Sequence, residues 1–184
     1  MKIIILGAGA VGRTLASLLS EEHDLVVVDQ DTAQLHRLEE ESDIQTLTGG
    51  ASYPNILVNA GIMDADMVVA VTDSDETNIV SCMISKVLNK SVQTVARVRE
   101  ISYLKGKTKE AMDSGEIPVD IHISPEQLIT EHIQGLIEIP GSLQVMEFGE
   151  GQLNLVAVRA VEGGPMIGHE IGDLKKHMPR IDSR

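Results

Sequence analysis

The chain has 184 residues, a length that suits one sizeable domain and a smaller appendage. Hydrophobic residues make up 42% of it and aromatic residues only 2%, which requires a core of aliphatic side chains, as in a parallel sheet buried between helices. The net charge of −13 argues against a nucleic-acid-binding surface and has solubility as its simplest explanation, while the single cysteine, Cys82, excludes an intrachain disulfide and favours a reducing compartment.

Short β-type runs alternate with helical patterns over the first two thirds of the chain. Strands are expected at 2–6, 25–29, 44–47, 67–72, 92–98 and 119–123. Helices are expected at about 11–21, 32–41, 53–60, 75–88 and 103–114. Because β and α elements alternate across short loops, the order predicts an α/β fold with right-handed crossovers, a complete doubly wound parallel sheet of the Rossmann type.

The first expected strand runs directly into three glycines, in the order Gly7-x-Gly9-x-x-Gly12, and a helical pattern follows. This is the dinucleotide-binding fingerprint in the context that it requires. Gly7 permits the tight turn, Gly9 lets a pyrophosphate approach the backbone, and Gly12 lets the helix pack against the strand. Amides around Ala10 and Val11, at the positive end of the helix, are expected to donate hydrogen bonds to phosphate oxygens.

An acidic residue, Asp29, ends the second expected strand, where dinucleotide-binding domains hold the ribose hydroxyls. A carboxylate there would repel a 2′-phosphate, and no arginine follows at once to bind one, so this position favours NAD(H) over NADP(H). The alternative is that the three glycines serve packing alone and that Asp29 caps the helix that follows it.

Further candidates follow the third and fourth expected strands, at the sheet edge where ligands bind in doubly wound folds. Glycines in the loop 48–52 would let the backbone approach an adenine or a ribose closely. Thr72 and Asp73 come just after the fourth strand. Asp73 together with Glu76 also fits a capping pair for the next helix, and both interpretations stay open.

Two arginines, Arg97 and Arg99, lie at the end of the fifth expected strand. In an acidic domain they could hold a phosphate or a carboxylate group. A surface ion pair explains these two arginines equally well, so the sequence leaves their role open.

The sequence offers little of the equipment of an enzyme. A dehydrogenase needs an acid–base group beside the nicotinamide, but His122 in the sixth strand and His132 on the next helix have no obvious partner carboxylate. Cys82 shares a helical face with apolar residues and is expected to lie in the core. No residues have metal-ligand spacing, and no P-loop or nucleophile elbow is present, so the site is predicted to bind a nucleotide without catalysis.

A sixth helix is expected over 125–137, with Pro140 and Gly141 ending it. One face of this helix carries an apolar stripe made of Leu128, Ile129, Ile133, Leu136 and Ile137. A lone domain would leave such a stripe partly exposed, which favours a partner surface, and packing on its own sheet is the alternative.

The pattern changes after this helix. Two strands, 143–148 and 153–160, are joined by a glycine-containing turn, and residues 166–184 are typical of a short helix leading into another strand. Because these elements have little left to pair against, we expect the chain to be a fragment of a longer protein.

Six segments of the chain together resemble a known family: "KIIILGAGAVGRTLASLL", "VVVDQD", "GGAS", "DADMVVAVTDSDETN", "ARVR" and "ISPEQL…IEIPG". They closely resemble the domains that regulate potassium transport and conductance (KTN or RCK domains), as found in regulatory subunits of bacterial potassium uptake systems. The resemblance is strong over residues 1–141. It implies a Rossmann domain over 1–124, a crossover and dimerisation helix with its linker over 125–141, and the start of a small α+β C-terminal subdomain over 142–184.

The resemblance implies a cytoplasmic protein, peripheral to the inner face of the cell membrane, that binds NAD(H), or in some members ATP or ADP, and controls a membrane potassium transporter subunit. It implies a dimer formed through helix 125–137, within a larger symmetric ring. In many relatives an Asp stands at the position of Gly50. The nucleotide contacts carried over are Gly7, Ala8, Gly9, Ala10, Val11, Gly12, Asp29, Gly50, Ala51, Thr72, Asp73 and Arg97.

The mechanism expected of such a protein is sensing, because different nucleotides would stabilise different hinge angles of the dimer, to which the transporter subunit responds. One alternative is an NAD-dependent oxidoreductase fragment that lacks its catalytic half. Another is an S-adenosylmethionine-dependent methyltransferase, which also uses a glycine-rich loop and an acid on the second strand. The interpretation of the chain as a purely structural module is possible only if no nucleotide binds.

Overall fold

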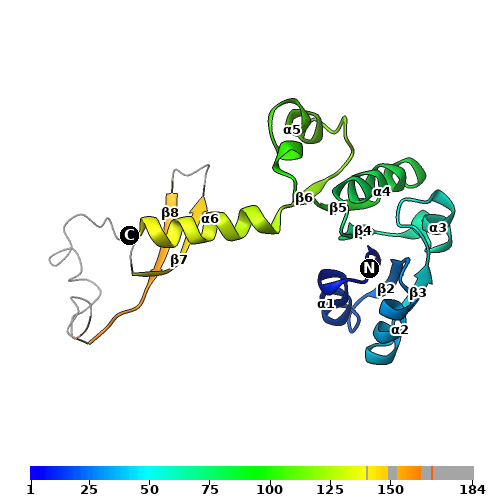
Figure 1. Ribbon diagram of the computed structural model, residues 1–184, viewed down its shortest axis with the longest axis horizontal. Helices are drawn as coiled ribbons and strands as arrows, with labels where there is room; N and C mark the ends of the chain where they lie inside the picture. Colours follow the sequence, from blue (N-terminus) through cyan, green and yellow to red (C-terminus); the bar gives the residue numbers. More distant parts are fainter. Residues whose placement is uncertain (140, 149–152, 163–166, 168–184) are drawn as a thin grey trace. The chain divides into compact units, whose positions relative to one another are not determined.

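Six strands form one parallel sheet in the computed structural model of the chain (Figure 1). The structure describes residues 1–139, 141–148, 153–162 and 167, and it divides into two units after Pro125. The strand order is β3-β2-β1-β4-β5-β6, so the predicted doubly wound Rossmann sheet is confirmed. The strands are β1 (Lys2–Leu6), β2 (Asp24–Asp29), β3 (Gln45–Thr48), β4 (Met67–Ala70), β5 (Gln93–Arg97) and β6 (Ile121–Ile123).

Helices cover both faces of this sheet. Strand β1 shows the division, because Ile3 and Ile5 are buried in one apolar core and Ile4 and Leu6 in another. A strand with two buried faces is apolar throughout, which is why continuous apolar runs predict a parallel sheet. The first core includes α1 (Ala10–Leu19) and α2 (Thr32–Glu41), and the second includes α3 (Pro54–Asn59), α4 (Asp75–Leu88) and α5 (Gly106–Asp113) (Figure 1).

The fifth helix expected over 103–114 is wrong in its first part. Residues Ile101–Leu104 form a short 3₁₀ helix (η2), and α5 begins only at Gly106. Lys105 is extended and Gly106 has a φ of +56°, so one continuous helix cannot pass through these two residues. A second 3₁₀ helix, η1 (Ile62–Asp64), has no counterpart in the prediction because a single turn carries no periodic signal.

Cys82 lies in the core, as the sequence predicts. Its side chain on α4 is 0% exposed, and Sγ lies 3.7 Å from the Val95 carbonyl oxygen of β5. Burial, together with the negative charge of Asp120, raises the pKa of the thiol to about 12, although Lys86 opposes this shift. The thiol therefore stays protonated at neutral pH, in keeping with a structural role.

A charged cluster ties α4 to β5 and to the start of β6. The Asp120 carboxylate accepts hydrogen bonds from the Thr94 backbone N–H (2.7 Å) and hydroxyl (3.0 Å) and pairs with Lys86 Nζ at 2.7 Å. Burial alone would raise the pKa of Asp120, but the contacts with Lys86 and Thr94 outweigh it and hold the pKa below its ordinary value of 3.8.

Replacing Asp120 with Asn is expected to lower the free energy of unfolding by about 1 kcal/mol at neutral pH, an effect kept small because 37% of the side chain is exposed. A carboxylate whose pKa is lowered by folding contributes stability above its unfolded-state pKa and loses it as the pH falls through the folded-state pKa. Urea unfolding from neutral pH down to below the folded-state pKa of Asp120 measures this. The difference in free energy of unfolding between the unchanged chain and Asp120→Asn should disappear in acid. Asp113→Asn, in an exposed pair with Lys109, is the control and should have little effect at any pH. A pH-independent difference for Asp120→Asn would contradict the electrostatic explanation.

The second unit contains α6 (Pro125–Glu138) and an antiparallel hairpin made of β7 (Ser142–Phe148) and β8 (Leu153–Val158). A Cβ on Gly135 would lie 3.2 Å from Val145 Cβ, so α6 packs closely on β7. The expected helix and both expected strands are present, although β8 ends at Val158 and not at residue 160. The elements expected within 166–184 lie outside the described residues, apart from residue 167.

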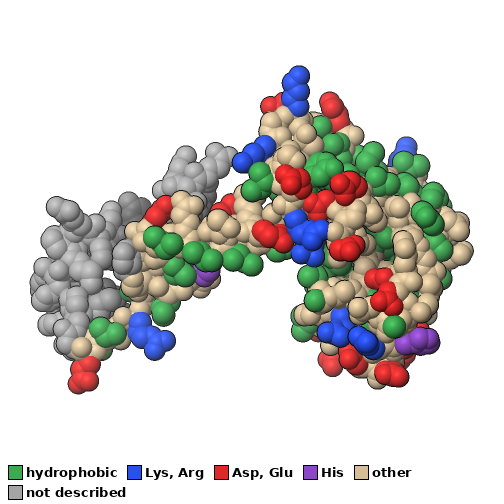
Figure 2. Space-filling model, in the orientation of Figure 1, with side chains coloured by type: hydrophobic (Ala, Val, Ile, Leu, Met, Phe, Trp, Pro, Cys, Tyr) green, Lys and Arg blue, Asp and Glu red, His purple; other side chains and the backbone are tan. Residues whose placement is uncertain are grey.

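An apolar stripe on α6 is exposed (Figure 2). Four of its side chains have exposed fractions between 51% and 71%: Leu128, Ile129, Ile133 and Ile137. None of the helices in the described part of the chain is long and apolar enough to cross a membrane.

Candidate nucleotide-binding site

A cavity of about 540 Å³ opens at the carboxyl ends of β1, β2, β4 and β5. In the sheet order β1 and β4 are neighbours, and the connections leave them toward opposite faces, so this is the topological switch point where doubly wound folds bind ligands. The cavity brings together nine of the twelve predicted residues: Gly7, Gly9, Ala10, Val11, Asp29, Ala51, Thr72, Asp73 and Arg97.

Two of the three glycines are required by the fold itself. Gly7 has a φ of +109°, and a Cβ on it would lie 3.0 Å from the Thr72 backbone nitrogen. A Cβ on Gly12 would lie 1.8 Å from the Gly7 carbonyl oxygen, which only a displacement of the backbone could relieve. Gly12 does not line the cavity, so its contribution is to let α1 pack against the turn after β1.

Gly9 is different from both of these. Its φ of −67° and ψ of −169° are open to any residue, and a Cβ on it would meet nothing within 4 Å. Nothing within the described protein therefore requires a glycine here, although Gly9 lines the cavity. A phosphate group would lie beside this glycine in the dinucleotide-binding fingerprint, where the absence of a side chain leaves room for it.

The amino end of α1 faces the same cavity. Gly9 is the N-cap residue and forms no side-chain capping bond, and the first turn holds no acidic residue. The N–H groups of Ala10 and Val11 precede the first intrahelical bond, from the Arg13 N–H to the Gly9 carbonyl, and both residues line the cavity. Such amides are suited to bind an anion.

Asp29 is held in place by two backbone amides. Its Oδ2 accepts a hydrogen bond from the Ala8 N–H (2.6 Å) and its Oδ1 one from the Asp31 N–H (2.8 Å). Each carboxylate oxygen keeps a further lone pair, which a ribose hydroxyl could use. The alternative that Asp29 caps α2 is wrong, because Asp31 is the cap and accepts from the Ala33 and Gln34 N–H groups.

Ala8 and Gly50, like Gly12, are predicted contacts that do not line the cavity. Ala8 is 0% exposed, and its N–H is the donor to Asp29. Gly50 faces the Tyr53 ring, since a Cβ on it would lie 3.0 Å from Tyr53 Cδ2, and the neighbouring Gly49 lines the cavity instead.

The loop after β4 forms the opposite wall, with Thr72 and Asp73. The N-cap of α4 is Ser74, whose Oγ accepts from the Thr77 N–H at 3.0 Å. The interpretation of Asp73 and Glu76 as the capping pair is therefore wrong, since Glu76 pairs with Ser74, and Asp73 serves no cap.

The two arginines have different surroundings. Arg97 lines the cavity. Arg99 does not: its Nε lies 3.5 Å from Asp75 Oδ1, its backbone N–H donates to Asp75 Oδ2 at 2.8 Å, and its guanidinium donates to the Asp73 carbonyl. Arg99 thus forms the ion pair that the sequence allowed, and Arg97, which lines the cavity, stays a predicted ligand contact.

Several lining residues were not predicted from the sequence, chiefly polar ones on the β2–α2 and α4 sides. Their positions in the sequence could have identified them. They end a strand, follow one directly or lie in the first turn of the next helix, at the carboxyl edge of the sheet where ligands bind. They are Val28, Gln30, Asp31, Gln34, Gly49, Val71 and Thr77.

Acidic residues predominate among the ionisable residues that line the cavity. Three acidic residues, Asp29, Asp31 and Asp73, line it together with Arg97. Among the described residues around it there is no histidine, cysteine, lysine or tyrosine.

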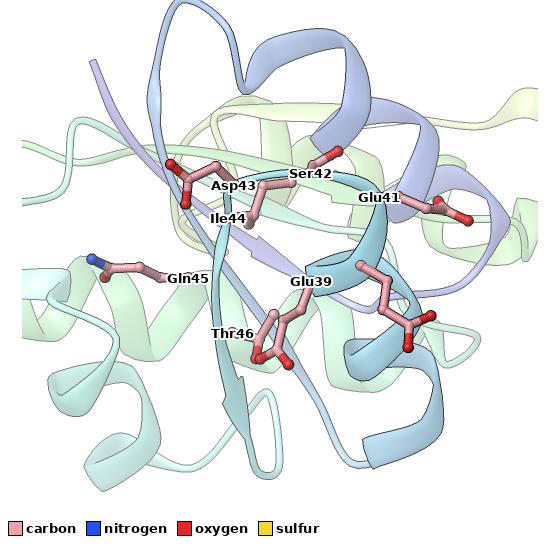
Figure 3. A pocket seen from close by; sticks show the side chains of 8 residues that line it. Glu39, Glu41, Ser42, Asp43, Ile44, Gln45 and Thr46 are labelled. Carbon is pink, nitrogen blue, oxygen red and sulfur yellow. The ribbon is translucent and has the colours of Figure 1, made fainter.

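A second hollow lies at the opposite, amino-terminal end of β3 (Figure 3). Carboxylates from the end of α2 surround it, and the Thr46 hydroxyl donates a hydrogen bond to Glu39. A surface so rich in carboxylates repels phosphate groups, so it does not suit a nucleotide. Its lining residues are Glu39, Glu40, Glu41, Ser42, Asp43, Ile44, Gln45 and Thr46.

Comparisons with known proteins agree with this geometry. The TrkA-N domain family matches residues 3–124. The Trk system potassium uptake protein TrkA of Halomonas elongata is 50% identical over 185 residues, covering 100% of this chain and 40% of that protein. The protein of the same name from Vibrio alginolyticus is 48% identical over 186 residues, again covering 100% of this chain and 40% of the relative. The chain thus spans about 40% of the length of the curated relatives it matches.

Solved structures support the fold. The TrkA-N domain of the inner membrane protein ybaL from Escherichia coli has a TM-score of 0.63 at 18% identity, covering 74% of this chain and 96% of that one. The GsuK channel bound to NAD has a TM-score of 0.65 at 22% identity, covering 95% of this chain and 30% of the channel. GsuK bound to ADP has a TM-score of 0.55 at 23% identity, covering 67% and 31%.

Proposed function

Because the chain belongs to the TrkA-N domain family, we propose that it is the nucleotide-sensing part of a regulator of potassium uptake, with NAD(H) as its first ligand and ATP or ADP as further ones. The relatives are named potassium uptake proteins, and two structural neighbours are a channel bound to NAD and the same channel bound to ADP. The observation that carries the proposal is the open space at Gly9, which the fold does not need.

The lining residues fit the parts of a dinucleotide. The pyrophosphate would lie over Gly9 and accept hydrogen bonds from the amides of Ala10 and Val11. The adenosine ribose would place its hydroxyls on Asp29, whose negative charge disfavours a 2′-phosphate. Thr72, Asp73 and Arg97 would contact the remaining half of the ligand, with Gly49 and Ala51 beside the adenosine.

Sensing fits this cavity better than turnover does. Hydride transfer to a substrate needs a proton donor or acceptor beside the nicotinamide, and histidine is the most frequent one. The described histidines of β6 and α6, His122 and His132, do not line the cavity. We therefore favour a regulator over an oxidoreductase fragment.

The remaining parts of the proposal concern assembly. The exposed stripe on α6 is apolar enough to form the interface of a dimer, which could belong to a larger ring. In the proposed organisation the nucleotide domain spans 1–124, the dimerisation helix and linker 125–141, and part of a C-terminal subdomain 142–184. Nucleotides that favour different dimer hinge angles would then act on a potassium transporter subunit at the cytoplasmic face of the membrane.

Calorimetric titration of the chain with NADH, NAD⁺, ATP, ADP and S-adenosylmethionine, with light scattering to measure mass, tests the proposal. Saturable binding of a nicotinamide or adenine nucleotide to a dimer, without substrate turnover, is the expected result. A folded chain that binds none of them would refute the proposed function. Binding of S-adenosylmethionine alone would favour a methyltransferase, and NADH-dependent reduction of a carbonyl substrate would favour an oxidoreductase.

Asp29→Ala is expected to weaken NADH binding by about 10- to 100-fold, because it removes charge-assisted hydrogen bonds to the ribose that contribute about 1.5–3 kcal/mol. Titration of NADH and of the pyrophosphate ion would separate ribose recognition from general damage, since pyrophosphate lacks the ribose. Asp24→Asn, at the exposed beginning of the same strand, is the matched control and should bind NADH normally. Equal losses for NADH and pyrophosphate would mean that Asp29 acts only by holding the Ala8 amide and the glycine turn.

A further inference from the structure

A buried amide side chain joins the two strand ends that form one wall of the cavity. Asn78 lies in the second turn of α4 and is 0% exposed. Its Oδ1 accepts hydrogen bonds from the Thr72 N–H (2.9 Å) and the Thr72 hydroxyl (2.7 Å). Its Nδ2 donates to the Thr72 carbonyl (3.2 Å) and to the Arg97 carbonyl (2.9 Å).

These partners determine the orientation of the amide group. A backbone N–H can only donate and a backbone carbonyl can only accept, so Oδ1 must face the Thr72 nitrogen and Nδ2 the Arg97 oxygen. Both Nδ2 hydrogens and both Oδ1 lone pairs are thereby used. Because the side chain is buried and each of its hydrogen-bonding groups has a partner, Asn78 is held in a single position.

The bonds of Asn78 begin where the strand ladder ends. The pairing of β4 with β5 runs from Met67 opposite Gln93 to Ala70 opposite Ala96. Beyond Ala70 the chain turns away into the loop that carries Thr72, while β5 continues to Arg97. Asn78 therefore connects the two segments by hydrogen bonds beyond the last residue pair of the β4–β5 ladder. Both segments line the cavity at this point.

Asn78 itself does not line the cavity. Through the carbonyl of Arg97 it holds the backbone of a residue that lines the cavity together with Asp29, Asp31 and Asp73. A binding group works well only if its position is held to about 0.5 Å. Pairing with Ile123 holds Arg97 on the β6 side, and the Asn78 amide holds it on the β4 side, where the β4–β5 ladder has already ended.

We propose that Asn78 is a positioning residue of the nucleotide site: it sets the distance between the Thr72 loop and Arg97 and so places the Arg97 side chain against the ligand. This inference rests on the proposed nucleotide-binding function. Asn78 has no contact with the ligand in this arrangement and acts through Arg97.

A double-mutant cycle on NADH affinity tests this role, using the unchanged chain, Asn78→Ala, Arg97→Ala and the double variant. Each single change is expected to weaken binding at least tenfold. The double variant should bind no more weakly than the weaker single variant, because the position of Arg97 no longer matters once its side chain is gone. Asn78→Ser repeats the cycle with a smaller disturbance in case Asn78→Ala does not unfold cooperatively.

Cys82→Ala is the matched control. It removes a buried side chain one turn further along α4 that also faces a β5 carbonyl, that of Val95, away from the cavity. It should lower stability but leave the NADH affinity within about twofold. A loss of affinity equal to that of Asn78→Ala would show that general loosening of α4 is enough, and would overturn the inference.

The outcomes separate this inference from the function on which it rests. If the unchanged chain binds no nucleotide, both are overturned. If it binds NADH but the effects of Asn78→Ala and Arg97→Ala multiply in the double variant, the proposed function stands and the positioning role of Asn78 is overturned.

Discussion

Replacing Gly9 with Val is expected to abolish dinucleotide binding while leaving the fold intact. The backbone at Gly9 is extended, and a Cβ there would meet no protein atom within 4 Å, so the side chain can be accommodated by the protein. It would then occupy the cavity over the α1 amides, at the place proposed for the pyrophosphate. The cost in stability should be about 1 kcal/mol at most, because Val is a poorer N-cap residue than Gly.

The measurement is NADH titration together with urea unfolding of the same preparations. Ser17→Val adds a β-branched side chain to the same helix outside the cavity and should bind NADH normally. Gly9→Ala, with a single added carbon, should fall between the unchanged chain and Gly9→Val. Normal binding by a well-folded Gly9→Val variant would place the nucleotide elsewhere on the protein.

Replacing Gly12 with Ala is expected to have the opposite outcome, a large loss of stability. The new Cβ would lie 1.8 Å from the Gly7 carbonyl oxygen, and a backbone oxygen cannot move aside as the end of a side chain can. Helix α1 would have to shift away from the turn after β1, which should lower the free energy of unfolding by about 3 kcal/mol or more.

Urea unfolding of Gly12→Ala beside Gly9→Ala makes the comparison, because the substitution is the same and the two positions belong to one motif. Gly9→Ala should unfold close to the unchanged chain, since its Cβ has free space and its φ is ordinary. If the two variants were equally stable, the distinction between a glycine needed for packing and a glycine needed for ligand access would be wrong.

The sheet could be predicted from the sequence because its signals are local. Apolar runs such as that of β1 identify a strand buried on both faces, and the strict alternation of strands and helices leaves few topologies open. The break before α5 was missed for a related reason: an extended Lys105 and a left-handed Gly106 interrupt a helical pattern without changing its apolar periodicity.

The candidate site could be predicted only in part, because its finer features depend on three-dimensional neighbours. Ser74 and not Asp73 caps α4, which a run of adjacent capping residues cannot reveal. Gly49 replaces Gly50 at the cavity because the Tyr53 ring covers the latter. Asn78 was overlooked altogether, although an asparagine on the apolar face of a helix is itself a signal of a buried hydrogen-bonded group.

The burial of Cys82 turns the only thiol of the chain into a built-in reporter of local opening. In the folded structure the Cys82 side chain is 0% exposed and the pKa of its thiol is about 12. A reagent that alkylates thiolates can therefore reach Sγ only while α4 is separated from β5. The alkylation rate is then proportional to the fraction of molecules in which the seam between α4 and β5 is open. The measurement reports local opening at one side chain, as amide hydrogen exchange does at a backbone N–H. Thr77 of α4 and Arg97 of β5 line the same cavity, so a ligand that contacts both would hold this seam closed. Its binding could then be followed as slower alkylation of Cys82.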